Sequence, residues 1–573
     1  MKSFGFSTGK GARPWMLGLM AGLVLLATAM AWHDLSTREV LGRDENATIT
    51  KLDQPGLRAV LAVTKMKVTG QPGNMQPLYF LLQHLFWPVV GRSAFVLRFL
   101  PSVFGVLCVA LTFKLGEVLW SRESGLVGAL LTALLPLHVR YAQIARPYTL
   151  LALLSLASAY FLVRSLQTNR LRDWFGFAVT ACLSFYTHYN ALLVLASEGL
   201  VAGAFWLAWL IAALRMHRSP GRLWRPALCF LVVAVLCAPG FISLLNVSGA
   251  EVGGQVAIDL TLPFLVRFLY RIGLTPPWLR GLILGLIGLG LAVTLYRRRW
   301  QAALFAALWL AIPFVALSVL KSSRPFAERY VIFVPPVALL LAGQGVVALG
   351  ELAGAVGRWR SAEGMRRATA VAISAGLGLL FVTPLSAYYA EGHTADRLDQ
   401  TLKVVEARAG PDDLVIVSPR FFVRPLAVDG AQVLYLVRQP SEAEFEELLS
   451  RAPRTWILYT SYLPPVELQE PLDRWVQARA DQFVRVPIKA INALAYSNHA
   501  ETDDVAALKD RVGLLEELAV VSADDQEAWF RYGVLADVYQ SLSQLYDERG
   551  EAALAAVYQK KAEEARATAP PPW

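Results

Sequence analysis

Residues 134–154 read LLPLHVRYAQIARPYTLLALL. One apolar segment ends in this stretch, a short connection rich in arginine, histidine and tyrosine follows, and a second apolar segment begins. The same alternation runs through the first 390 residues, and the whole chain of 573 residues is 55% hydrophobic and 17% charged. This composition and this pattern predict a polytopic α-helical membrane protein.

The apolar segments are numerous enough for about eleven membrane spans, and up to about thirteen, although several are shorter than the roughly 18 residues that suit a bilayer core. The segments lie at residues 15–32, 99–119, 124–137, 148–164, 174–187, 190–213, 227–245, 279–296, 301–320, 330–350 and 368–390. Residues 78–90 form either a further span or a helix at the membrane surface. The first segment follows basic residues as a signal peptide does, but the number of spans after it favours an uncleaved anchor.

The distribution of basic residues predicts the orientation of these spans. The N-terminus carries Lys2, Lys10 and Arg13, and it is therefore expected in the cytoplasm. Basic clusters then fall on inside connections, at residues 164–172, 215–225, 297–299 and 358–367. The net charge of +10 is explained by these topology signals rather than by a face that binds nucleic acid. An odd number of spans places everything after residue 390 outside the cytoplasm.

Some connections on the predicted outer side break this charge rule. They hold His138, Arg140, Tyr141, Arg146, Tyr148, His188, Tyr189, Arg324, Arg329 and Tyr330. Snorkelling arginines and an aromatic belt explain any one of these residues equally well. As a set, they predict an outward-facing site for an anionic ligand. Arg146-Pro147 opens a span, and a helix N-terminus beside an arginine binds phosphate well. Arg324-Pro325 precedes another span in the same way.

Two adjacent carboxylates, Asp44 and Glu45, follow the first apolar segment after a short connection. Ionisable groups just outside a membrane core are costly to order and tend to serve chemistry or ion handling. A solvated surface pair is the alternative interpretation. Because the cationic and aromatic residues described above are expected on the same side of the membrane, the sequence favours a functional role for this pair.

Five stretches of the chain resemble a known family of membrane enzymes. They are RDENA (43–47), QPLYFLLQHLF (76–86), GRSAFVLRFLPSVFGVL (91–107), LLPLHVRYAQIARPYTLLALL (134–154) and FAERYVIFVPPVALLLAG (326–343). In this order they resemble the bacterial dolichyl-phosphate-mannose–protein mannosyltransferase-like family, which includes the aminoarabinose transferases and has the GT-C glycosyltransferase fold. The resemblance covers most of residues 30–350.

The resemblance implies an integral-membrane glycosyltransferase of the bacterial inner membrane. Such an enzyme moves a sugar from a polyprenyl-phosphate donor to an acceptor on the outer face. The resemblance also implies Asp44 as the catalytic carboxylate, with Glu45 adjacent to it. Donor-phosphate contacts are implied at Arg146 and Arg329, with Arg140 and Arg324 as further candidates. The remaining site candidates are His138, Tyr141, Tyr148, His188, Tyr189, Tyr330, Gln76 and Tyr79.

Two positions depart from the family pattern. The family often has His-Pro-Pro-Leu-Tyr where this chain has MQPLY at residues 75–79, and often an acidic residue where Ile144 stands. A metal ligand or a second carboxylate is therefore not carried over to these positions, and the sequence does not indicate a divalent metal ion. The four cysteines all lie within apolar runs and imply neither disulfides nor a metal site.

The residue types support the same chemistry without the family. An acceptor hydroxyl must lose a proton as it attacks the anomeric carbon of the sugar, and a positioned carboxylate can accept that proton. The leaving phosphate needs no general acid if Arg146, Arg324 or Arg329 stabilises its charge. A single displacement of this kind inverts the anomeric centre.

The composition changes near residue 393, and we expect three domains. They are a transmembrane GT-C domain (1–392), a small extracytoplasmic α/β domain (393–500) and a helical tail (501–573). In the second domain, strands at 414–419, 433–437 and 456–460 alternate with helices at 441–451 and 466–480. The tail partly matches one tetratricopeptide unit, and a plain helical tail is the equal alternative.

Two other functions compete with the glycosyltransferase. A lipid or sugar transporter or flippase would more often show two related halves with broken helices near the midplane, and no such repeat is evident. A membrane scaffold would leave Asp44-Glu45 and the outer arginines unexplained. The sequence identifies neither the sugar nor the acceptor, which is a protein, a lipid or a glycan. Membrane lipids are expected partners, and nucleic acid is not.

Overall fold

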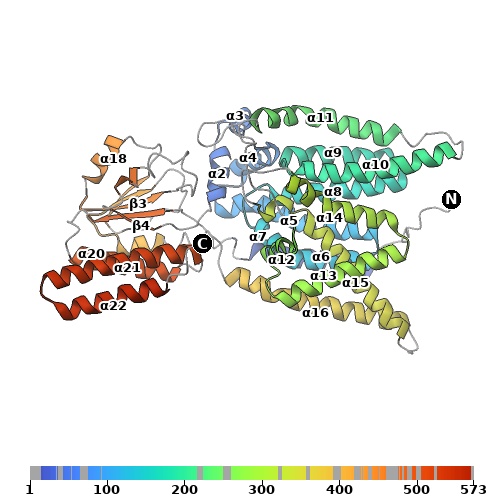
Figure 1. Ribbon diagram of the computed structural model, residues 1–573. Helices are drawn as coiled ribbons and strands as arrows, with labels where there is room; N and C mark the ends of the chain where they lie inside the picture. Colours follow the sequence, from blue (N-terminus) through green and yellow to red (C-terminus); the bar gives the residue numbers. More distant parts are fainter. Residues whose placement is uncertain are drawn as a thin grey trace. The chain divides into compact units, whose positions relative to one another are not determined.

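The structure is a computed structural model (Figure 1). It describes residues 14–33, 35, 43–52, 54–64, 75–91, 93–215, 224–248, 260–319, 326–356, 362–390, 402–417, 428, 430–435, 442–450, 452–459, 475–476, 478–479, 483–486, 493–498, 505–521 and 525–568. The chain divides into two compact units. The first comprises Met1–Thr37 and Thr48–Glu391, and the second comprises Arg38–Ala47 and Gly392–Trp573.

The first unit is a helical bundle whose long helices run side by side (Figure 1). Its helices are α1 (Pro14–Trp32), α2 (Arg43–Leu52, which begins in the second unit), α3 (Leu57–Thr64), α4 (Leu78–Val90), α5 (Ala94–Leu119), α6 (Arg122–Leu134), α7 (Pro136–Ala142), α8 (Tyr148–Thr168), α9 (Leu171–Thr187), α10 (Ala191–Arg215), α11 (Trp224–Ser248), α12 (Leu262–Arg271), α13 (Pro277–Tyr296), α14 (Trp300–Val319), the 3₁₀ turn η1 (Glu328–Val331), α15 (Val334–Val356) and α16 (Ala362–Ala390).

The prediction of a polytopic membrane protein is confirmed. Within the described part of the chain, eight helices are long and apolar enough to cross a bilayer, or nine if the bent pair α6–α7 counts as one span. Each of the eleven predicted segments contains a helix, but α1 and α9 are short, so the number eleven stays a prediction. Helix α4 has 13 residues and is about 20 Å long, which is too short to cross a core of about 30 Å.

One predicted connection is wrong. The sequence was interpreted as a span ending at residue 137 and a polar connection from 138 onward, yet the chain continues as helix α7 to Ala142. Pro136 occupies the first turn of α7, where its fixed φ suits a helix start. The chain bends by 63° between α6 and α7. His138, Arg140 and Tyr141 therefore lie on a helix.

Small residues let the central helices of the bundle approach closely. A Cβ atom at Gly290 of α13 would collide with the Leu341 carbonyl of α15, and one at Gly345 would collide with the Leu286 carbonyl. On the other side of α15, the Ser124 hydroxyl donates to Gln344 Oε1 at 2.7 Å. Close backbone contact and buried polar pairs of this kind hold membrane helices together where no hydrophobic driving force acts between them.

The basic clusters gather at one end of this bundle. Arg297, after α13, forms an ion pair with Glu351 of α15, and Arg366 of α16 approaches the same carboxylate at 3.8 Å. Nearby, Arg299 donates to the Trp120 carbonyl after α5 at 2.8 Å. This segregation is what the positive-inside rule would produce. The orientation of the chain in the membrane stays a prediction.

The second unit contains a five-stranded sheet of order β2-β1-β3-β5-β4. Strand β1 (Leu414–Val417) pairs in parallel with β2 (Gln432–Tyr435) and β3 (Arg454–Tyr459). Strand β5 (Ala493–Asn498) pairs antiparallel with β3 and with β4 (Val484–Val486). The helices are α18 (Glu442–Leu449), α20 (Val505–Val521), α21 (Asp525–Glu548) and α22 (Ala552–Thr568). The sequence reasoning missed β4 and β5, and most of its helix at 466–480 lies outside the described residues.

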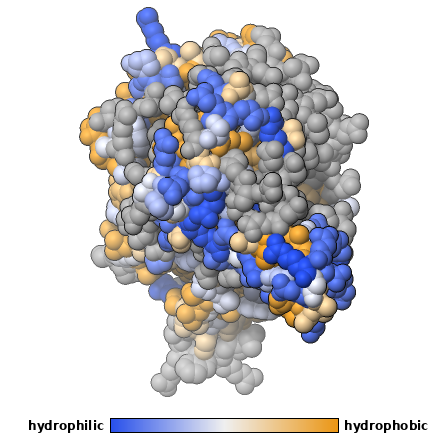
Figure 2. All heavy atoms as spheres, turned by 90° about the vertical axis from the view of Figure 1, so that its left-hand side faces the viewer, coloured by the Kyte–Doolittle hydropathy of each residue, from blue (hydrophilic) through white to orange (hydrophobic). Residues whose placement is uncertain are grey.

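The described parts of the sheet and of the tail share one hydrophobic cluster, in which Trp456 and Tyr496 of the sheet lie with Leu515 and Tyr539 of the tail. Whether residues 393–500 and 501–573 are separate domains stays a prediction. On the face seen in Figure 2, hydrophilic residues alternate with smaller apolar patches. Among the described residues of this unit, the large apolar side chains that are exposed are Leu554 and Val557. The bundle exposes many more, as expected of a surface that faces lipid.

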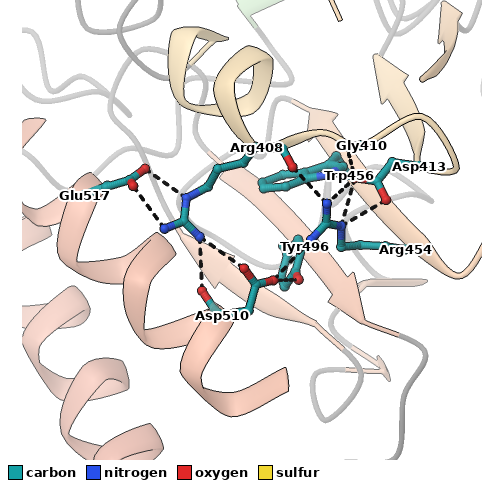
Figure 3. Close-up of polar contacts among 8 residues, drawn as sticks. All are labelled: Arg408, Gly410, Asp413, Arg454, Trp456, Tyr496, Asp510 and Glu517. Atoms are coloured by element: carbon teal, nitrogen blue, oxygen red, sulfur yellow. Dashed lines mark hydrogen bonds and ion pairs between the residues drawn. The ribbon is translucent and has the colours of Figure 1, made fainter. Parts of the chain in front are cut away.

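A chain of ion pairs joins the sheet to the tail (Figure 3). Arg454 of β3 contacts Asp413 at 2.7 Å and Asp510 of α20 at 3.3 Å. Arg408 contacts the same Asp510 at 3.3 Å and Glu517 at 2.9 Å. Arginine forks that each bridge two carboxylates fix geometry as well as charge. This network holds α20 against the ends of β1 and β3.

Candidate functional site

The short connection between α7 and α8, residues 143–147, is held by neighbouring segments. The Gln143 side chain donates to the Met30 carbonyl at 3.1 Å and to the His33 carbonyl at 2.9 Å, both at the end of α1. The Tyr388 hydroxyl of α16 donates to Gln143 Oε1 at 3.0 Å. These bonds fix the connection to the outer ends of two helices.

Helix α2 holds the same connection from a third side. The Thr48 hydroxyl donates to the Ala145 carbonyl at 3.0 Å. The next residue, Arg146, is buried, with only 8% of its surface exposed. Pro147 follows and α8 begins at Tyr148, as the sequence predicted. The guanidinium of Arg146 is thus placed beside the first turn of α8 by a connection that is tied down on both sides.

Two arginines from distant parts of the sequence converge on the ring of Tyr148. The guanidinium carbon of Arg146 lies 5.9 Å from the ring centroid, and that of Arg329 in η1 lies 5.9 Å from the same centroid. Arg329 also lies 5.6 Å from the ring of Tyr330. At this range the face of an aromatic ring attracts a cation. The sequence placed these residues in one predicted site, and the structure brings them together.

His188 completes the aromatic side of this cluster. It follows the last residue of α9, and its ring centroid lies 5.7 Å from that of Tyr148. The backbone N–H of Asn190 donates to Nδ1 of His188 at 3.1 Å, so the proton of the neutral ring is on Nε2. Burial, and then the positive charges of Arg146 and Arg329, lower the pKa of His188 to about 4. The imidazole is therefore neutral at physiological pH and can donate one hydrogen bond.

Glu328, which the sequence reasoning did not single out, engages two of the predicted residues. The Tyr141 hydroxyl donates to Glu328 Oε1 at 3.2 Å. Arg140 Nη1 lies 3.8 Å from the same oxygen, with its side chain half-exposed. The rings of Tyr141 and Tyr148 are 5.1 Å apart. Arg140 is thus already paired with a carboxylate, which makes it a weaker candidate for a ligand phosphate than Arg146 or Arg329.

Lys51 is a third cation that the sequence reasoning missed. It lies in α2 with 2% of its surface exposed. Its Nζ donates to the Val63 carbonyl at 3.1 Å and lies 5.9 Å from the ring of Phe80. Burial, and then the charge of Arg146, lower the pKa of Lys51 to about 8. The available signal was its place among the apolar positions of the helix that follows the acidic pair.

The other predicted residues lie at various distances from chemistry of this kind. His138 Nε2 has the Gly105 carbonyl as its hydrogen-bond partner at 3.0 Å, within the wall of the bundle. The hydroxyl of Tyr79 accepts from Gln83 Nε2 at 3.0 Å. Gln76 is buried at the start of α4, and the Tyr189 ring contacts that of Phe185. Arg324 lies outside the described residues.

Asp44 and Glu45 lie in the first turn of α2. Glu45 is buried, and the side chain of Asp44 is outside the described residues. Both belong to the segment Arg38–Ala47, which is grouped with the second unit. Within one helix, residues spaced by four and then three positions share a face, which gives Asp44 the same face of α2 as Thr48 and Lys51. Among the described residues, no group of three or more His, Cys, Asp or Glu side chains could hold a metal ion.

Residues 71–241, which carry Arg146, Tyr148 and His188, match the family of dolichyl-phosphate-mannose-protein mannosyltransferases. The chain is a membrane glycosyltransferase of this family. The family resemblance drawn from the sequence is thereby confirmed, and the enzyme is favoured over the transporter alternative. No curated protein sequence matches the glycosyltransferase.

Solved structures show the same fold. The glycosyltransferase is similar to ArnT from Cupriavidus metallidurans in the apo state, with a TM-score of 0.51 and 14% identity over 84% of this chain and 98% of that chain. ArnT from the same organism bound to undecaprenyl phosphate gives a TM-score of 0.49 and 14% identity over 86% and 99% of the two chains. The Archaeoglobus fulgidus oligosaccharyltransferase tethered to an acceptor peptide gives 0.45 and 12% over 77% and 69%. The GT-C fold of the glycosyltransferase follows from the first of these.

Proposed function

We propose that the enzyme transfers a sugar from a polyprenyl-phosphate donor to an acceptor on the extracytoplasmic face of a bacterial inner membrane, and that the donor phosphate binds at the cation cluster around Tyr148. One observation carries this proposal. Arg146 and Arg329 come from opposite ends of the bundle's sequence and both lie 5.9 Å from one ring.

An anion would relieve a conflict that this cluster contains. Lys51, Arg146 and Arg329 are like charges, and the charge of Arg146 already lowers the pKa of Lys51. A phosphate bound among them would offset that repulsion, and partial burial would strengthen each attraction. Guanidinium groups suit phosphate because they can donate two parallel hydrogen bonds. The neutral His188 could add a donor from Nε2 without adding charge.

In the proposed reaction, Asp44 acts as the general base, with Glu45 adjacent. The acceptor oxygen attacks the anomeric carbon, its proton passes to the carboxylate, and the bond from the anomeric carbon to the phosphate oxygen breaks. The electron pair leaves with the polyprenyl phosphate, where Arg146 and Arg329 stabilise the added charge. One displacement inverts the configuration. The contact of Thr48 with the Ala145 carbonyl supports this arrangement, since it ties the helix of Asp44 to the connection that carries Arg146.

The topology prediction completes the proposal. The cytoplasmic N-terminus and the basic end of the bundle put the Tyr148 cluster outside, with the second unit. The identity of the sugar and of the acceptor, whether protein, lipid or glycan, is left to experiment.

The test is transfer itself. Purified enzyme incubated with a panel of polyprenyl-phosphate sugars should release polyprenyl phosphate from at least one of them. Asp44→Asn should reduce that release by about 10²–10⁴-fold while leaving thermal stability near that of the wild type. Glu45→Gln is the matched variant. If both variants keep near wild-type turnover, the acidic first-turn mechanism is wrong, and if no donor in the panel is used, the proposed reaction fails.

A further inference from the structure

Helix α12 has three distinct faces, and one of them packs on the bundle. Phe264 and Phe268 point inward, where their ring centroids lie 5.2–6.1 Å from those of Phe314 in α14 and Phe326 before η1. Thr261 begins the helix by accepting the backbone N–H of Phe264 at 3.4 Å. The Leu137 N–H of α7 donates to the Ile272 carbonyl at 3.2 Å. Helix α12 is therefore fixed at the same end of the bundle as the Tyr148 cluster.

The second face of α12 is apolar and uncovered. Leu262, Leu265, Val266 and Tyr270 are exposed, Leu262 to 71% and Tyr270 to 54%. Apolar side chains on a helix that already buries its opposite face require an apolar partner. The chain on each side of α12 leads to a span-length helix, α11 or α13. Trp278, at the start of α13, is exposed as well, and exposed Trp and Tyr at span ends mark the membrane interface.

The third face of α12 is basic. Arg271 donates to the Phe326 carbonyl at 3.1 Å. Arg267, one turn earlier, is exposed, and no residue in the described part of the chain forms a hydrogen bond or an ion pair with its guanidinium. Arg280 lies close by, 5.9 Å from the ring of Tyr270. Basic residues beside an apolar helix face that lies in the interface meet lipid phosphates.

We propose that α12 lies in the membrane–water interface and binds the phosphate of an anionic phospholipid through Arg267. Its apolar face enters the acyl region, and the positive charge of Arg267, with Arg280 nearby, selects anionic over zwitterionic headgroups. The same helix braces Phe326, three residues before Arg329, by ring contacts and by the Arg271 bond. The lipid site is separate from the proposed donor site and does not require it to be correct.

A label at one position tests this site without any turnover. All four native cysteines are buried, so Val266→Cys in the full-length protein can carry an NBD group selectively. The labelled protein is placed in nanodiscs that contain either brominated phosphatidylglycerol or brominated phosphatidylcholine at the same fraction. We expect both lipids to quench the label, and the local enrichment of phosphatidylglycerol to be about fivefold, the effect of one arginine near an anionic headgroup.

Adding Arg267→Gln should abolish that enrichment, whereas Arg298→Gln, at the far end of α13, should leave it intact. Absence of quenching by either lipid would show that α12 is not in the membrane. Equal quenching by the two lipids would remove the anionic headgroup from the proposal. Enrichment that persists in Arg267→Gln would show that another group makes the contact. None of these readouts depends on donor or acceptor, so their failure is distinct from failure of the proposed reaction.

Discussion

Replacing Arg146 by alanine should weaken donor use sharply. Its side chain is buried, lies 5.9 Å from the Tyr148 ring and, in our proposal, donates to the donor phosphate. Losing one charge-assisted hydrogen bond costs about 1.5–3 kcal/mol, which corresponds to about a ten- to hundredfold loss. Part of this loss is offset, because removing Arg146 also relieves the repulsion that lowers the pKa of Lys51. We therefore expect the lower half of that range at neutral pH.

The assay is a donor titration of purified variants in matched lipid, reported as kcat and KM. Arg146→Lys keeps the charge but loses the bidentate geometry, so its donor dependence should fall between wild type and Arg146→Ala. Arg297→Ala is the control, because Arg297 pairs with Glu351 and a half-exposed ion pair contributes little. Thermal unfolding of each variant separates loss of binding from loss of structure. Equal donor dependence in Arg146→Ala and Arg297→Ala would refute the anion-site reasoning.

Three further outcomes are expected. Donor affinity should fall as the pH rises through about 8, because Lys51, whose pKa is lowered to about 8, loses its charge; in Lys51→Met, donor KM measured at several pH values should stay flat, and a fall of equal size there would assign the titration to another group. Gly290→Ala should lower the unfolding temperature because its Cβ would meet the Leu341 carbonyl, whereas Gly288→Ala on the same helix points into open space and should not; similar melting of both would contradict the packing argument. An alkaline phosphatase fused to the C-terminus should be active, and an inactive phosphatase together with a fluorescent C-terminal GFP fusion would overturn the predicted topology.

The sequence was informative where composition alone determines structure. Apolar length located every long helix, and the Arg146-Pro147 pair located the start of α8, since proline fixes the first helical turn. It failed where two interpretations share one composition. Pro136 begins a new helix after a bend of 63°, but in sequence it also reads as the end of a span. The polar residues after it therefore appeared to lie in a loop.

The site was only partly predictable for a related reason. Arginines and tyrosines on outer connections stand out because they break the charge rule. Lys51 and Glu328 do not, since a lysine in a short helix and a glutamate beside an arginine are ordinary surface residues until tertiary packing buries them. In the same way, Arg38–Ala47 is grouped with the second unit, although nothing in its sequence distinguishes it from the bundle. Contacts between segments distant in sequence carry that information.

The central claim is the place of the donor phosphate. Cryo-electron microscopy of the purified enzyme with a polyprenyl phosphate in nanodiscs would test it directly. The account predicts density for the phosphate within hydrogen-bond distance of the guanidinium groups of Arg146 and Arg329, beside the Tyr148 ring. Phosphate density elsewhere on the bundle, with both guanidinium groups left without contact to it, would contradict the account.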